Sequence, residues 1–227
     1  MKQKATFFLL GVVLLGLFAG FSKYVKRGGL KKLDFDVTVK LQDNIPSRFD
    51  QLMDDGAILA DGIVSSVLVL SITAWVCIGT KKKRFFLGAA AIPLAFFVLG
   101  VLEIYGKNML PHPGPPFFMV KQPTTIFPKF HVVQPYSYPS GHAARSTFLG
   151  VIVGAIVFKR FASMPQKRKL FIFLIAGYCV FVWVSRIYLG HHWLSDIVGG
   201  VLLGASVSLA AVGVLNLLFR GSIMQKQ

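Results

Sequence analysis

The chain has 227 residues, of which 54% are hydrophobic and 15% charged, with a mean hydropathy of +0.63. This composition is too apolar for an ordinary soluble domain of this size, and the two cysteines, both inside apolar runs, predict neither a disulfide framework nor a metal site. The formal net charge of +16 is concentrated in short segments between apolar runs, which favours topology signals over nucleic-acid binding. We therefore expect an integral membrane protein surrounded by membrane lipids, with no nucleic-acid partner.

Six segments satisfy the requirement of about 20 mostly apolar residues for a membrane-spanning helix. In chain order they are roughly residues 5–22, 57–79, 85–104, 141–158, 170–188 and 197–219. We therefore predict an all-α fold, a six-transmembrane-helix bundle that forms a single integral membrane domain over residues 1–227. The first segment follows Lys2 and Lys4, as in a signal peptide, but it has no clear small-residue cleavage site, so we interpret it as a retained anchor.

Basic residues in the short loops predict the orientation of these helices. They fill the loop after the second segment and the loop after the fourth, and they are Lys81, Lys82, Lys83, Arg84, Lys159, Arg160, Lys167, Arg168 and Lys169. Both loops and, with an even number of spans, both termini are expected on the cytoplasmic side of the plasma membrane. Residues 23–56 carry charges of both signs among apolar residues, and we expect them to form an interfacial segment on the outer face.

The remaining loop on the outer face, residues 105–140, contains eight prolines and is predicted to be irregular. All five histidines fall on this face: His112, His131, His142, His191 and His192. For His112, His131 and His191 we expect exposed or structural roles.

The other two histidines have neighbours that point to phosphoryl transfer. His192 precedes Asp196 by four residues, so in a helix the carboxylate can fix the imidazole tautomer that serves as a nucleophile. Ser140 is a good N-cap, and Gly141 allows an anion to approach the first free N–H groups of a helix. His142, on the first turn of that helix, is then placed to protonate a leaving alkoxide.

Two cations near helix ends complete the predicted site. Arg186 lies six residues before His192; its guanidinium either binds phosphate or extends to the lipid headgroups, and the neighbouring motif favours phosphate. Lys107 either joins the phosphate site or is an ordinary interfacial lysine. Glu103, four residues earlier, is spaced to pair with it on one helix face.

In their order along the chain, these motifs resemble those of the type 2 phosphatidic acid phosphatases, which share an active site with vanadium haloperoxidases and show KxxxxxxRP, PSGH and SRxxxxxHxxxD. Two motifs match completely, at Pro139, Ser140, Gly141, His142, Ser185, Arg186, His192 and Asp196. In the first motif Lys107 and Pro115 match, whereas Gly114 stands at the arginine position. The resemblance implies a PAP2-like catalytic core over residues 85–219.

The resemblance also implies a function, that of a membrane lipid phosphatase. His192 would attack phosphorus to form a phosphohistidine, Asp196 would orient it, and His142 would protonate the leaving oxygen. The phosphate oxygens would be held by Lys107, Ser140, Gly141 and Arg186. No metal and no other cofactor is implied, because lysine and arginine supply the positive charge.

We expect the substrate to be a lipid phosphate or diphosphate, and phosphatidic acid, phosphatidylglycerol phosphate and undecaprenyl diphosphate are all compatible with the sequence. One alternative is a lipid phosphotransferase, in which the acceptor is not water. The other is a non-catalytic lipid-phosphate binder or transport component, for which Gly114 is the supporting feature. His142, His192 and Asp196 favour the enzyme, because binding alone needs no oriented nucleophile.

Gly114 leaves one phosphate ligand to be supplied by another residue. Arg145 is our candidate, because it follows His142 by three residues and so projects from nearly the same helix face. The alternative for Arg145 is an ion pair with an acid such as Glu103 or Asp61. Weaker candidates for the ligand are Lys121, Lys129 and His112.

Overall fold

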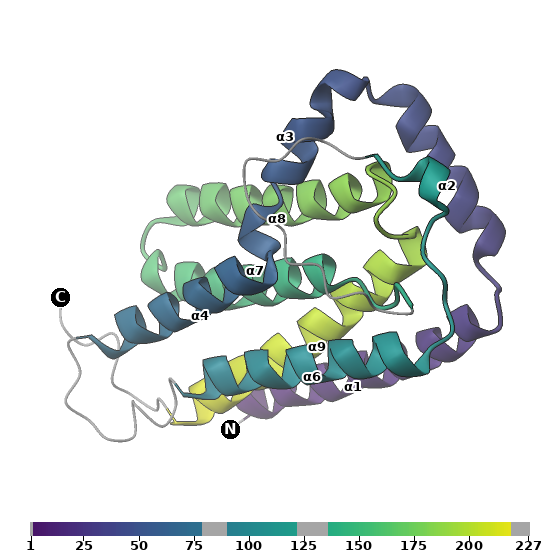
Figure 1. Ribbon diagram of the computed structural model, residues 1–227. Coiled ribbons are helices and arrows are strands. Elements are labelled where there is room, and N and C mark those ends of the chain that lie inside the picture. Colours follow the sequence, from purple (N-terminus) through teal and green to yellow (C-terminus); the bar gives the residue numbers. More distant parts are fainter. Residues whose placement is uncertain (1, 79–89, 122–135, 219–227) are drawn as a thin grey trace.

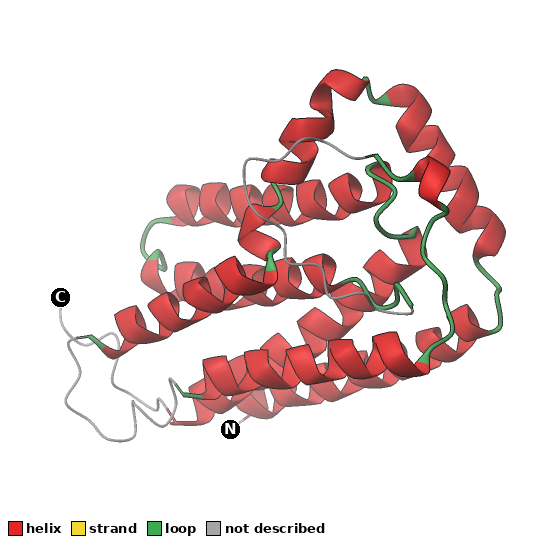
Figure 2. Ribbon diagram, viewed as in Figure 1, coloured by secondary structure: helices red, strands yellow, loops and turns green. Residues whose placement is uncertain are grey.

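The computed structural model describes residues 2–78, 90–121 and 136–218, and the regular structure in these ranges is helical (Figures 1 and 2). Its α-helices are α1 (Lys2–Lys26), α2 (Lys31–Asn44), α3 (Asp50–Asp55), α4 (Gly62–Cys77), α6 (Ala91–Met109), α7 (Gly141–Arg160), α8 (Pro165–Tyr188) and α9 (Leu194–Leu218). Short 3-10 turns cover Ser47–Phe49, Ile58–Ala60 and Phe117–Met119. The predicted all-α fold class is confirmed.

Within the described residues, five helices are long and apolar enough to cross a membrane: α1, α6, α7, α8 and α9. The predicted count of six is therefore one too high. The second predicted segment, 57–79, divides into the Ile58–Ala60 turn and α4, which has only 16 residues. Asp61 causes the division, because it is the N-cap of α4 and accepts a 2.9 Å hydrogen bond from the N–H of Ile63.

Several expectations concern residues outside the described ranges. These are the basic loop 81–84, the first residues of the third predicted segment at 85–89, Lys129, His131, and the C-terminal residues 219–227, whose side of the membrane was predicted.

Helix α9 is the centre of the bundle and packs against α1, α6 and α7 (Figure 1). Small residues allow this close approach, as is common between membrane helices. A side chain at Gly204 would collide with the carbonyl group of Ala144 in α7, and one at Gly200 would collide with that of Ser140. The beginnings of α7 and α9 are consequently held together.

Helices α2 and α3 cross one end of the bundle, where α2 contacts α8 and α9 and α3 contacts α8 (Figure 1). Gln42 of α2 fixes this arrangement by donating hydrogen bonds to the carbonyl of Met119 at 2.7 Å and to that of Tyr188 at 2.9 Å. The segment predicted to lie on the membrane surface therefore also covers the end of α8. Its position relative to a membrane stays a prediction.

Candidate active site

The predicted site residues come from the end of α6, the beginning of α7, the end of α8 and the beginning of α9. Ser140 is the N-cap of α7, as predicted, and its hydroxyl oxygen accepts from the N–H of Ala143 at 3.4 Å. The N–H of Ser140 donates to the backbone oxygen of Asp196 at 3.0 Å. The motif that begins α7 is therefore tied directly to the motif that begins α9.

Asp196 is fully buried, and His192 Nδ1 lies 3.3 Å from its Oδ2 atom. His192 is not in a helix, as the spacing argument assumed, but in the turn that precedes α9. The pair forms because Asp196 folds back over the helix end, where its Oδ2 also accepts a 2.9 Å bond from the N–H of Trp193. This is the geometry of a carboxylate at the third helical position that caps its own helix.

The turn that carries His192 depends on Gly190. Its φ of +69° lies in the left-handed region, where glycine has no steric penalty, and its N–H donates to the carbonyl of Ile187 at 2.9 Å. The N–H groups of His191 and His192 both donate to the carbonyl of Arg186, at 3.0 and 3.2 Å. The end of α8 therefore fixes the backbone on which His192 stands.

The surroundings of the His192 imidazole favour its neutral form. Burial lowers its pKa to about 3, and the positive charges of Lys107 and Arg186 act in the same direction. A histidine must be unprotonated to attack phosphorus, so this environment suits a nucleophile.

Lys107 and Arg145 share one carboxylate, that of Glu103. Lys107 Nζ lies 3.1 Å from Glu103 Oε1, as its spacing predicted, and Arg145 Nη1 lies 2.6 Å from Glu103 Oε2. Arg145 Nε also donates to the carbonyl of Ala60 at 2.8 Å. For Arg145 the structure thus shows the alternative that the sequence left open, an ion pair with Glu103, and its role as a phosphate ligand stays a prediction.

The Glu103–Arg145 pair packs on Gly141. A side chain at that position would collide with the Glu103 carboxylate and would lie 2.7 Å from Arg145 Nη1. Lack of a side chain at Gly141 therefore brings an anionic group and a cation against the N-terminus of α7, where an anion is favoured.

Arg186 is turned into the protein, with 3% of its surface exposed, and does not extend outward as an interfacial arginine would. Its Nη1 lies 3.1 Å from Asp54 Oδ1, and its Nη2 donates to the carbonyl of Met53 at 2.7 Å. Its Nε donates to Ser185 Oγ at 3.2 Å. Its Nη1 also lies 3.4 Å from His191 Nδ1, in the turn after α8. Asp54 and Met53 come from α3, which sequence reasoning did not connect with the site.

His142 lies on the first turn of α7, and the charges of Arg186 and Arg145 are near enough to act on it electrostatically. The charges of Lys107, Arg186, Glu103 and Arg145 act electrostatically on His192. The structure therefore gathers the predicted residues in one charged cluster, although their roles toward phosphate stay predictions.

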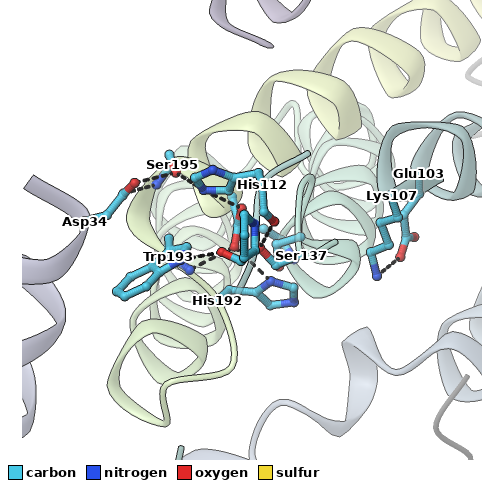
Figure 3. A network of polar contacts seen from close by, with 12 residues as sticks. Asp34, Glu103, Lys107, His112, Ser137, His192, Trp193 and Ser195 are labelled. Carbon is cyan, nitrogen blue, oxygen red and sulfur yellow. Dashed lines mark hydrogen bonds and ion pairs between the residues drawn. The ribbon is translucent and has the colours of Figure 1, made fainter. Parts of the chain in front are cut away.

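The two weaker candidates for the missing arginine that the structure describes, Lys121 and His112, contact other protein groups. Lys121 is paired with Asp50 at 3.3 Å and donates to the hydroxyl of Tyr188 at 2.9 Å. His112 is buried, and its Nε2 lies 3.4 Å from Asp196 Oδ1 (Figure 3). Sequence reasoning missed this contact; the signal for it was the place of His112 inside the first motif, between Lys107 and Gly114.

Two further residues of this cluster were not predicted, Asp34 and Ser195 (Figure 3). Both are buried, and both oxygens of the Asp34 carboxylate accept hydrogen bonds from Ser195. Ser195 lies beside Asp196 in the third motif, but nothing in the sequence around Asp34 points to this partner. In residues 2–78, 90–121 and 136–218, no group of three or more His, Cys, Asp or Glu side chains is arranged to hold a metal ion.

Comparison with known proteins identifies what this arrangement resembles. The sequence profile of the PAP2 superfamily matches residues 84–220. Undecaprenyl-diphosphatase of Sulfolobus acidocaldarius is 27% identical over 205 residues, which cover 89% of each chain. Phosphatidylglycerophosphatase B of Bacillus subtilis is 33% identical over 70 residues, which cover 30% of this chain but only 34% of that relative.

The fold has a counterpart among solved structures. The crystal structure of a transmembrane PAP2 type phosphatidylglycerolphosphate phosphatase from Bacillus subtilis superposes with a TM-score of 0.71, covering 94% of this chain and 98% of that one. Sequence identity between the two is 18%, so the similarity concerns the fold.

The role of Arg145 can be tested against Gly114. If Arg145 also contacts phosphate, Arg145→Ala should lower kcat/KM by about tenfold or more, because charge-assisted hydrogen bonds contribute roughly 1.5 to 3 kcal/mol. A second substitution, Gly114→Arg, should then restore part of the loss. The first atom of a side chain is tolerated at this position, since a Cβ atom there would lie 3.4 Å from Ser137 Cβ.

Thermal unfolding in detergent provides the control for this pair of variants, because loss of the Glu103 contact also removes a structural ion pair. A single Arg145→Ala variant with nearly normal kcat/KM and an unchanged unfolding midpoint would show that the missing ligand lies elsewhere.

Proposed function

Because the chain belongs to the PAP2 superfamily, and the relatives it matches are phosphatases, we propose that it removes the terminal phosphate of a lipid phosphate or diphosphate with His192 as the nucleophile. The observation that carries the proposal is the 3.3 Å contact between His192 Nδ1 and the buried Asp196 carboxylate. A carboxylate in this position accepts the Nδ1 hydrogen and leaves the Nε2 lone pair for the substrate.

The proposed reaction has two steps. In the first, His192 Nε2 bonds to the terminal phosphorus, and the bond from this phosphorus to the leaving oxygen breaks. The leaving oxygen is the lipid oxygen of a monophosphate or the bridging oxygen of a diphosphate, and His142 gives its proton to it. In the second, His142 takes a proton from a water molecule whose oxygen attacks phosphorus, and the phosphorus–nitrogen bond breaks. The products are the dephosphorylated lipid and inorganic phosphate, and both histidines return to their starting state.

Fixed positive charge supports both steps without a metal in this proposal. Lys107 and Arg186 are held by the Glu103 and Asp54 carboxylates before substrate binds. A phosphate that enters therefore meets cations that need little reorganisation, together with the N–H groups at the start of α7. Ser140, Gly141 and, as the predicted substitute for the missing arginine, Arg145 complete the proposed phosphate site.

The names of the relatives support two substrates to test first, a phosphatidylglycerol phosphate and undecaprenyl diphosphate. Phosphatidic acid is the third. A site at the ends of membrane-crossing helices suits all three, because the phosphate can reach it while the lipid tail stays in the bilayer. The non-catalytic lipid-phosphate binder is the second candidate function, supported by Gly114 at the arginine position of the first motif.

We propose further that the site faces away from the cytoplasm in the plasma membrane. Helix α7 has 20 residues and so is about 30 Å long, enough to cross the hydrocarbon core. The predicted site lies at its first turn, and the basic residues Lys159 and Arg160 lie at its last. Basic residues next to spanning helices favour the cytoplasmic side.

Turnover tests the proposed function directly. Purified protein in detergent with EDTA present should release phosphate from at least one of the three lipids. His192→Ala should abolish release, and Asp196→Asn should lower kcat by about 10³- to 10⁴-fold, as when the tautomer-setting carboxylate of a catalytic histidine is lost. The matched control is Asp43→Asn, the same chemical change at an exposed position of α2, which should leave kcat unchanged. Lipid binding without release by the wild type would favour the binder.

Orientation can be tested by labelling cysteines in intact cells. In a background without Cys77 and Cys179, Phe118→Cys should react with a membrane-impermeant thiol reagent, because this side chain is 82% exposed near the proposed site. Gln166→Cys, exposed in the first turn of α8 between basic residues, should react only after the cells are lysed. The opposite pattern would overturn the proposed orientation.

A further inference from the structure

A buried chain of polar contacts leads from α2 to the carboxylate of the proposed site (Figure 3). Asp34 Oδ1 accepts from the N–H of Ser195 and Asp34 Oδ2 accepts from its hydroxyl, each at 2.8 Å. Ser195 Oγ lies 3.1 Å from His112 Nε2. The same nitrogen lies 3.4 Å from Asp196 Oδ1, a close polar contact, and Oδ1 makes no hydrogen bond within the described residues. Asp34, Ser195 and Asp196 are each at most 2% exposed, and His112 is 7% exposed.

With Asp34 ionised, the hydrogens in this chain have one arrangement. A carboxylate only accepts, so both hydrogen atoms that Ser195 offers, on its nitrogen and on its hydroxyl, point at Asp34. The Ser195 oxygen must then accept from its other neighbour, His112 Nε2. This nitrogen therefore carries a hydrogen whether the ring is neutral or charged. That hydrogen points toward Ser195 Oγ, and the nitrogen itself lies 3.4 Å from Asp196 Oδ1.

The backbone around His112 holds its ring in this place. The carbonyl of His112 accepts from both the N–H and the hydroxyl of Ser137, each at 3.0 Å, and its own N–H donates to the carbonyl of Leu110 at 2.8 Å. The ring of Tyr138 packs edge-on against the imidazole, with 6.2 Å between ring centroids. His112 is therefore oriented from its backbone as well as from Ser195.

The contact between His112 and Asp196 Oδ1 bears on the proposed nucleophile, because the other carboxylate oxygen contacts His192. Oδ2 accepts from the N–H of Trp193 and is in contact with His192 Nδ1. Oδ1 is buried without a hydrogen-bond partner among the described residues, so the 3.4 Å contact with His112 Nε2 acts on this oxygen through electrostatics. The contact attracts Oδ1, and so opposes rotation of the carboxylate about its Cβ–Cγ bond, only in the form of His112 with a hydrogen on Nε2, because a ring nitrogen with a lone pair repels a carboxylate oxygen.

We propose that Asp34, Ser195 and His112 are positioning residues, which fix the hydrogen on His112 Nε2 and so hold the Asp196 carboxylate in the orientation that sets His192. This inference rests on the proposed function of His192 and Asp196. It assigns a role to a residue of α2, which lies outside the range 84–220 matched by the family profile. The segment before the matched region then completes the active site and does more than cover it.

The substitution Asp34→Asn tests the direction of the hydrogens. An asparagine of the same shape must turn either its NH₂ group or its oxygen toward the Ser195 hydroxyl. Only the orientation with the NH₂ group toward the hydroxyl leaves the asparagine oxygen as acceptor for the Ser195 N–H. In this orientation the NH₂ group donates to Ser195 Oγ. The hydroxyl must now donate to His112 Nε2, which loses its hydrogen and presents a lone pair to Asp196 Oδ1.

Two measurements report this change in full-length protein in detergent. With ¹⁵N-histidine labelling, the His112 Nε2 signal, assigned by its loss in His112→Gln, should have the chemical shift of a protonated ring nitrogen in the wild type and of an unprotonated one in Asp34→Asn. The kcat for the best lipid substrate should fall about 10- to 100-fold, the range seen when groups that orient an active-site histidine are removed, with little change in KM. Asp36→Asn, the same change at an exposed position of α2, should alter neither.

A variant at Ser195 tests whether Asp34 acts through the chain of hydrogen bonds from Ser195 to His112, here called the relay, or only through the stability of the fold. In Ser195→Ala no hydroxyl can donate to His112 Nε2, so His112 can keep its hydrogen on that nitrogen, next to Asp196. Adding Asp34→Asn to this variant should leave the Nε2 signal that of a protonated nitrogen and change kcat by less than about twofold. An Asp34→Asn effect of equal size with and without the serine hydroxyl would overturn the relay. So would an unprotonated Nε2 in the wild type, which can be seen even if no lipid is hydrolysed. A wild type that releases no phosphate but shows the expected nitrogen signals would instead count against the proposed function alone.

Discussion

The structure depends on one buried negative charge, the carboxylate of Asp196. A charge without solvent is costly unless hydrogen-bond donors surround it, and in a membrane bundle no water of the bilayer core can provide them. Its surroundings come from three separate parts of the chain. Trp193 and His192 contact it from the turn after α8, and His112 contacts it from the loop after α6. The backbone oxygen of Asp196 accepts a hydrogen bond from the N–H of Ser140 at the start of α7. The carboxylate that orients the proposed nucleophile therefore also determines how three helix ends meet.

The cations of the site follow the same rule of local compensation. Arg186 is matched by Asp54 of α3, and Lys107 and Arg145 are matched by Glu103 of α6. Each pair keeps a positive group in place in the absence of phosphate, at the cost that an entering phosphate must compete with a carboxylate. In the proposed reaction the anionic substrate is attracted by the whole cluster, while the neutral His192, whose pKa burial lowers to about 3, stays able to attack. Charge balance and reactivity thus have one structural origin.

Sequence reasoning succeeded where the relevant geometry is local. Apolar length gave the long helices, the Ser-Gly pair gave the N-cap at Ser140, and a four-residue spacing brought His192 to Asp196, even though the contact forms across a helix start and not within a helix. It failed where partners are far apart in the chain. Asp34 and Ser195 are separated by 161 residues, so no periodicity or spacing connects them, and the role of Asp54 toward Arg186 was invisible for the same reason. The choice between phosphate and Glu103 for Arg145 also needed the packing of α6 against α7.

The central claim is that the Asp196 carboxylate makes His192 the residue that accepts the phosphoryl group. It is tested most directly by stopping turnover of a lipid labelled in its terminal phosphate with an alkaline denaturant, because phosphohistidine is lost in acid. The label is then located by peptide mass spectrometry at neutral or alkaline pH. The account predicts an acid-labile phosphoryl group on His192 that is present in the wild type, strongly reduced in Asp196→Asn and missing in His192→Ala. Label on a different residue would contradict this claim. So would turnover without covalent label in a variant that slows the second step, such as His142→Ala assayed with a lipid whose leaving group needs no proton.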